Sequence, residues 1–112
     1  MRTYHSILSL TATMTATCNA GDLVGFDDAP ITTADAPVKG IAQVPATEVG
    51  LDIALTAAGF ETVTASGVIT AGDKLVSALA GGVSVAGVDP DNVFATALTS
   101  AADGDLVQIL IR

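Results

Sequence analysis

The side chains that could support catalysis are few. His5 is the single histidine of the chain, and Cys18 is its single cysteine. Cys18 has no neighbouring cation in the sequence that would lower its thiol pKa, so it is expected to be a buried apolar residue. Ser84 lies between Gly82 and Ala86 in a segment that only superficially resembles a serine nucleophile turn, because no histidine follows it. The sequence therefore predicts a protein that is not an enzyme.

The acidic residues do not form a recognisable metal site. Two short runs, Asp89-Pro90-Asp91-Asn92 and Asp103-Gly104-Asp105, bring several oxygens together. Calcium requires more oxygen ligands than either run supplies, and the spacing of a calcium-binding loop is absent. Glycine-rich phosphate-binding motifs are absent as well. We therefore expect no metal and no cofactor, and we expect these aspartates to cap turns.

The charge balance narrows the range of partners. The chain has 12 acidic and 4 basic residues, giving a net charge of −8. Binding to a nucleic-acid backbone or to an anionic membrane needs clustered lysines and arginines, which this sequence lacks. An acidic surface keeps a protein dispersed and prevents non-specific adhesion to nucleic acid. Neither nucleic acid nor membrane is an expected partner.

The composition indicates a thin core. With 112 residues the chain fits one domain, and half of its residues are hydrophobic although only 4% are aromatic. The core must therefore be built from valine, isoleucine, leucine and alanine. Such small side chains suit sheet layers better than a deep ligand pocket.

The first segment alternates between apolar and polar residues. Leu8, Leu10, Ala12, Met14, Ala16 and Cys18 share one parity, and Ser9, Thr11, Thr13, Thr15 and Thr17 share the other. A period of two residues is typical of a half-buried strand and not of the continuous apolar region of a signal peptide. We therefore expect residues 1–19 to form an N-terminal arm or first strand, and residues 20–112 to form the main domain.

The rest of the chain consists of short alternating segments separated by glycine, aspartate, asparagine and proline. This pattern is typical of an all-β sandwich or barrel. We expect strands at 23–26, 38–44, 51–56, 60–65, 74–78, 83–86, 93–99 and 106–111. The predicted fold class is all-β, a small β-barrel or β-tulip-like sandwich with an extended N-terminal strand or arm.

A Gly-Asp pair precedes a strand three times. The pairs are Gly21-Asp22, Gly72-Asp73 and Gly104-Asp105. Glycine supplies the positive φ that tight turns often need, and the aspartate carboxylate can accept backbone N–H groups. Because the spacing between the pairs is uneven, the pattern indicates repeated use of the same turn chemistry and not a solenoid repeat.

The order of these motifs resembles that of the tailed-phage capsid cement, or head decoration, protein family. The resemblance covers about residues 20–112. It rests on the segments AGDLVGFDD, APVKGIAQVPA followed by EVG, ASGVITAGDKLVS, AGGVSVAG and FATALTSAADGDLVQILIR. Typical members run through Gly-Asp turns and an alanine-rich strand to a final Gly-Asp strand, as here.

The resemblance implies a structural virion protein. Such proteins are made in the bacterial cytoplasm and join the outer surface of the expanded phage capsid, where they stabilise the shell against DNA pressure. The implied partners are the phage major capsid protein and further copies of the chain, with a homotrimer expected first and a dimer second. The family supplies no catalytic residue to carry over.

The N-terminal arm is the expected contact surface. A polar face and an apolar face without internal glycine or proline suit addition to a partner sheet. The expected contact residues are Thr3, Tyr4, Ile7, Leu8, Leu10, Thr11, Thr13, Met14 and Thr15. The sequence leaves open whether they contact the capsid, a neighbouring subunit, or the sheet of their own domain.

The alternative is a lipoyl- or biotinyl-like β-sandwich carrier, which also uses Ala-Gly-Asp turns. Such a carrier presents a modified lysine at a hairpin tip. Lys39 and Lys74 are the candidates by residue type, but the neighbouring residues of neither match that setting.

Overall fold

A computed structural model describes residues 5–79, 81–88 and 90–111. All regular secondary structure in these ranges is β, so the predicted all-β class is confirmed. The strands are β1 (His5–Thr13), β2 (Leu23–Val24), β3 (Gly40–Ala42), β4 (Asp52–Thr64), β5 (Lys74–Ser77), β6 (Val83–Val85), β7 (Ala95–Ala97) and β8 (Leu106–Ile111). In the described ranges, no helix is long and apolar enough to cross a membrane.

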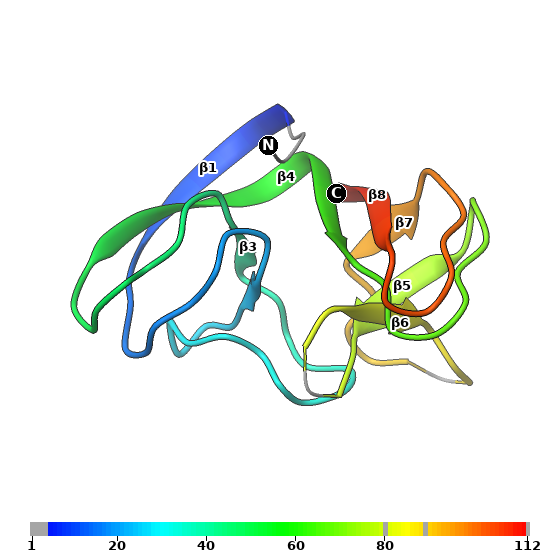
Figure 1. Ribbon diagram of the computed structural model, residues 1–112, viewed down its shortest axis with the longest axis horizontal. Coiled ribbons are helices and arrows are strands. Elements are labelled where there is room, and N and C mark those ends of the chain that lie inside the picture. The colour runs from blue at the N-terminus through cyan, green and yellow to red at the C-terminus, as the bar shows by residue number, and fades with distance from the viewer. Residues whose placement is uncertain (1–4, 80, 89, 112) are drawn as a thin grey trace.

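The strands form one antiparallel sheet that curls into a half-barrel (Figure 1). Its order is β2-β3-β4-β8-β7-β5-β6, and β1 pairs with β4 outside this path. Figure 1 shows β4 running from the ribbon that it forms with β1 to the group of strands β5 to β8. Strand β4 therefore connects the two sides of the molecule.

Two strands predicted separately are one. Segments 51–56 and 60–65 were expected to be interrupted, but β4 is continuous over 13 residues. Gly59 lies in its middle with a φ of 125°, a conformation that L residues rarely adopt. A Cβ at this position would overlap the carbonyl oxygen of His5 in β1. The glycine therefore bends the strand beneath β1 instead of ending it.

The buried apolar residues form two hydrophobic clusters, and the larger one combines residues from both halves of the chain. The smaller contains Ala12, Met14, Cys18, Val24, Ala42, Ala46, Ile53 and Leu55. The larger contains Leu23, Ile31, Ile41, Val63, Ala65, Ile69, Leu75, Val83, Ala95, Ala97, Val107, Ile109 and Ile111. Every member is aliphatic or sulfur-containing, as the scarcity of aromatic residues requires.

The two sides of the molecule repeat the same hydrogen bonds. The Gly21 and Gly72 N–H groups donate to the Ala42 and Ala97 carbonyls respectively, both at 2.8 Å. The Ala42 and Ala97 N–H groups return bonds to the Asp22 and Asp73 carbonyls, both at 2.9 Å. The isolated bridge Cys18–Ala46 likewise matches the bridge Ile69–Ala101. We call residues 5–57 the N-terminal unit and residues 56–111 the C-terminal unit. The two ranges overlap at residues 56 and 57 because β4 belongs to both units.

Strand pairing follows the same correspondence. In the N-terminal unit Leu10 and Ala12 lie opposite Leu55 and Ile53, and in the C-terminal unit Glu61 and Val63 lie opposite Ile109 and Val107. Strand β1 is thus the equivalent of the second half of β4, and the first half of β4 is the equivalent of β8. The long strand serves as the last strand of one unit and the first strand of the next.

Candidate interaction surface

The side chains that were considered for catalysis lie apart from one another, and the packing of the fold accounts for their positions. Cys18 is buried, and its backbone pairs with that of Ala46. Burial raises the pKa of the Cys18 thiol; the Ala46 backbone hydrogen bond opposes this rise and the nearby Asp22 charge adds to it. His5 is exposed at the start of β1, and Ser84 is partly buried in β6. Within the described ranges, no three His, Cys, Asp or Glu side chains gather to hold a metal ion.

Of the two lysines considered for a carrier function, Lys39 is held in an ion pair and Lys74 is exposed at the start of a strand. Lys39 Nζ lies 2.7 Å from Asp28 Oδ1, and both side chains are largely shielded from solvent. Lys74 begins strand β5, opposite Thr96. Neither is presented at the tip of a hairpin in the manner of a modified carrier lysine.

Strand β1 belongs to the sheet of its own domain. It pairs with β4 from His5–Phe60 to Thr13–Asp52. The pairing has irregularities on both sides of Leu8, and in the described structure β4 is the only strand paired with β1. The opposite edge of β1 therefore presents unpaired backbone groups.

The predicted apolar face of this segment is buried over only part of its length. Ala12, Met14 and Cys18 are core residues, as the two-residue period predicts. Leu8 and Leu10 have the same parity in the sequence but are 51% and 38% exposed, and Ile7 is 77% exposed. These three residues place exposed apolar surface on one strand at the edge of the described sheet.

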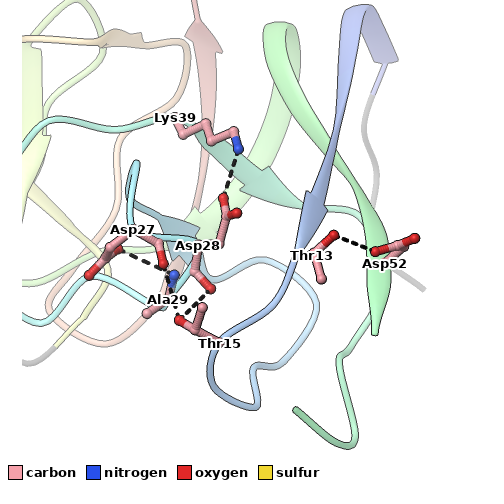
Figure 2. A network of polar contacts seen from close by, with 7 residues as sticks. All are labelled: Thr13, Thr15, Asp27, Asp28, Ala29, Lys39 and Asp52. Atoms are coloured by element: carbon pink, nitrogen blue, oxygen red, sulfur yellow. Dashed lines mark hydrogen bonds and ion pairs between the residues drawn. The ribbon is translucent and has the colours of Figure 1, made fainter. Parts of the chain in front are cut away.

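Polar residues at and just after the end of β1 anchor it to strand β4 and to one loop (Figure 2). The Thr13 hydroxyl donates to Asp52 Oδ1 at 2.6 Å, across the β1–β4 pair. The Thr15 hydroxyl donates to the carbonyl oxygens of Asp27 and Asp28, each at 3.1 Å. Asp28 in turn forms the ion pair with Lys39, so the loop that accepts Thr15 is itself fixed.

Thr11, Thr13 and Thr15 are exposed, whereas Met14 is buried in the smaller cluster. Thr3 and Tyr4, which we also predicted as contact residues, lie outside the described residues. Of the predicted contact residues that the structure describes, Ile7, Leu8 and Leu10 offer apolar surface and the three threonines offer polar surface.

A chain of polar side chains that the sequence does not predict runs from the exposed Ser9 in β1, through the half-buried Gln43, to the centre of the sheet. The Gln43 amide donates to Ser9 Oγ and Thr56 Oγ1, both at 3.0 Å. The Thr56 hydroxyl donates to Glu61 Oε2 at 2.8 Å, and both Thr56 and Glu61 are fully buried. Only the bend at Gly59 brings Thr56 and Glu61 together, so linear periodicity gave no signal for this contact.

The Gly-Asp turns fall into two kinds. Asp22 Oδ2 accepts the Asn19 N–H and Asp73 Oδ2 accepts the Thr70 N–H, both at 2.9 Å. The turn at Gly104 differs. Its N–H donates to the Ala65 carbonyl at 2.8 Å, and the Gly50 N–H donates to the Met14 carbonyl at the same distance. The third turn is therefore the equivalent of the turn at Gly50 and not of the first two.

The fold is similar to that of the N base of the head fiber gp8.5 of bacteriophage phi29, known from a crystal structure. The likeness has a TM-score of 0.72 at 23% sequence identity. It covers 94% of this chain and 93% of that chain. The two chains share a fold. A scan against models of protein families finds no match, and a search of curated proteins also finds none.

Proposed function

We propose that the protein is a structural component of a tailed-phage virion that binds the outer surface of the expanded capsid and stabilises it. The observation that carries the proposal is the fold likeness to a phage head fiber base over nearly the whole of both chains. It agrees with the order of Gly-Asp motifs that resembles the capsid cement family. The two arguments are independent, since one uses backbone geometry and the other uses residue types.

The physical character of the molecule supports a binding role. Its turns are fixed by carboxylate and threonine hydrogen bonds, and its strands enclose two small aliphatic clusters. A fixed shape loses little conformational entropy on binding, which favours docking to a rigid lattice. The net charge of −8 keeps many copies dispersed until they meet the shell.

Affinity for a capsid need not come from one strong contact. An oligomer that touches several capsid subunits at once gains avidity from effective concentration. We therefore propose a homotrimer at three-fold positions of the shell, with a dimer at two-fold positions as the alternative. Capsid expansion would bring the surfaces of the shell subunits to the spacing that the oligomer requires.

Binding to shells in the two maturation states tests the proposal. Purified protein is mixed with expanded empty shells and, in parallel, with unexpanded procapsids of the phage that encodes it, and the bound copies are counted after sedimentation. We expect saturable, stoichiometric binding to expanded shells and none to procapsids. Equal binding to both, or binding to neither, would contradict the proposal.

The exposed start of β1 is the surface that we propose takes part in capsid binding. Removal of the whole segment is a poor test, because Ala12 and Met14 are core residues. Ile7→Asp leaves the core intact and is expected to lower shell occupancy. Val88→Asp is the control, since Val88 is 94% exposed and lies in a loop of the other unit. Equal shell occupancy for the two variants would mean that Ile7 does not contact the capsid.

A further inference from the structure

The loops that precede β3 and β7 are equivalent segments of the two units. Each loop begins and ends at a residue whose N–H donates to the strand before the loop. These bonds run from Ile31 to Leu23 and from Lys39 to Val24 in one unit, and from Ala86 to Lys74 and from Phe94 to Leu75 in the other. We call residues 32–38 the first loop and residues 87–93 the second loop.

The first loop is held by the C-terminal unit. The Ser77 hydroxyl donates to the Thr33 carbonyl at 2.8 Å, and the Asp35 N–H donates to the Ser77 carbonyl at 3.0 Å. The Asp35 carboxylate accepts two successive N–H groups of the second loop at 2.9 Å, those of Asp91 and Asn92. The first loop therefore occupies a site formed by Ser77 and the second loop.

The equivalent site of the N-terminal unit is open. Phe26 is the equivalent of Ser77, because each lies two residues after the carbonyl that accepts the N–H at the end of its loop. Ala36 and Pro37 are the equivalents of Asp91 and Asn92, because they lie at the same places before that N–H. Phe26, Ala36 and Pro37 all line one surface hollow of about 280 Å³. The site that a loop occupies in one unit is thus a hollow in the other.

The residue types at the hollow exclude the kind of occupant that the C-terminal unit holds. Pro37 has no N–H, and the Ala36 N–H already donates to Ser77 Oγ at 2.8 Å, so neither is available to bind a carboxylate. Phe26 places an aromatic ring where the C-terminal unit has a hydroxyl. Asp27 also lines the hollow and would repel a second carboxylate. The hollow therefore favours an apolar segment without acidic residues.

The exposure of Phe26 points to a partner at this place. Phe26 is 71% exposed, whereas the other aromatic side chains that the structure describes, Phe60 and Phe94, are half-buried. Aromatic side chains in a concave surface are common anchors of protein contacts. A second copy of this chain fits poorly, because it carries the same net charge of −8 and its second loop would bring Asp91 toward Asp27.

We propose that the hollow at Phe26 binds an extended loop of the phage capsid protein, one with apolar side chains and no acidic residue. The inference rests on the proposed function and adds a second contact to it. The contact is loop against loop, as it is between the first loop and the C-terminal unit. The capsid loop packs on the Phe26 ring and on Pro37 instead of presenting a carboxylate.

The hollow and the exposed start of β1 lie at opposite ends of one strand. Thr15, just after β1, donates to the carbonyl of Asp27 at the hollow, whereas Ile7 lies near the first residue of β1 (Figure 2). The nine residues of β1 span about 30 Å. One copy would therefore contact the shell at two separate places and could join two capsid subunits. Each contact would raise the effective concentration of the other.

Replacement of Phe26 by the residue type of its equivalent position tests the contact. Phe26→Ser removes the ring and leaves both apolar clusters intact. We expect its affinity for expanded shells to fall by at least about tenfold. Val68→Ser is the matched control, because Val68 is 73% exposed and does not line the hollow. It should bind like the unmodified chain, and circular dichroism checks that both variants fold.

The possible results separate this inference from the proposed function. If the unmodified chain does not bind shells, both are wrong. If shells bind the unmodified chain, Phe26→Ser and Val68→Ser equally well, only the contact at Phe26 is wrong. Sedimentation of the free chains adds a third result. If Phe26→Ser weakens self-association and leaves shell binding unchanged, the hollow binds a second copy and the inference is overturned.

Thiol labelling provides a readout that leaves Phe26 in place. Thr32 is exposed and lines the hollow, so Thr32→Cys reports whether the hollow is covered. With shell sites about tenfold above the apparent Kd, labelling of Thr32→Cys should be about tenfold slower than in the free chain. Val68→Cys should react at similar rates in both states, and Cys18 is buried. A Thr32→Cys thiol that reacts equally fast on shells would overturn the inference.

Discussion

At the scale of single residues, two aspartates have the same task. Asp22 and Asp73 each accept one N–H at 2.9 Å in equivalent turns. We expect Asp22→Ala and Asp73→Ala each to lower the free energy of unfolding by about 1 kcal/mol, because each removes one hydrogen bond near solvent. The losses should add in the double variant, since the turns lie in different units. Urea unfolding measures all three changes.

Asp105→Ala is the control for this experiment. Asp105 also follows a turn glycine, but its carboxylate accepts no hydrogen bond within the described residues. Its replacement should change stability by less than about 0.5 kcal/mol. A cost equal to that of Asp22→Ala would mean that the turn hydrogen bonds are not the source of stability.

Cys18 provides a prediction about reactivity and pH. Because burial raises the pKa of its thiol, the folded chain retains the proton where the unfolded chain loses it. The resulting stabilisation is present below the pKa of the unfolded thiol and is lost as the pH rises through the folded value. At about pH 8, near the pKa of a free thiol, reaction with an aromatic disulfide should be on the order of 100-fold slower than in urea. Equal rates would show that Cys18 is accessible.

At the scale of elements, the bend in β4 depends on one residue. Gly59→Ala should lower the free energy of unfolding by about 2–5 kcal/mol, because it adds both backbone strain and overlap with His5. Gly50→Ala separates these two causes. Gly50 also has a positive φ, of 94°, but a Cβ there would meet nothing within 4 Å. The control should cost only about 1–2 kcal/mol, and thermal unfolding compares the two.

The sequence predicts individual strands better than it predicts their environment. The two-residue period correctly places Ala12, Met14 and Cys18 inside. It cannot show that Leu8 and Leu10 lie on the uncovered part of the same strand, because periodicity reports side-chain direction and not what packs against it. The separate strands predicted at 51–56 and 60–65 are continuous through Gly59, which bends β4 beneath β1. Its contact with β1 is long-range and leaves no local signal.

At the scale of the whole molecule, the chain is a tandem of two equivalent β-units joined by one continuous strand. The repeated Ala-Gly-Asp motif is the part of this arrangement visible in the sequence. The sequence alone does not show which Gly-Asp pairs are equivalent, because Gly104-Asp105 has the same residue types but occupies the position equivalent to Gly50. Residue types also differ at matched positions, as at Glu61 and Leu10, so the equivalence appears only in the hydrogen bonds.

The proposed virion role is also a property of the whole molecule, since no single cluster of described side chains carries it. It is tested most directly by quantifying this polypeptide in purified, mature particles of the phage that encodes it, before and after mild protease treatment of the intact particles. The account predicts many copies per particle, in fixed proportion to the major capsid protein and accessible to protease from outside. Purified particles that lack the polypeptide, or that enclose it where protease cannot reach it, would contradict the account.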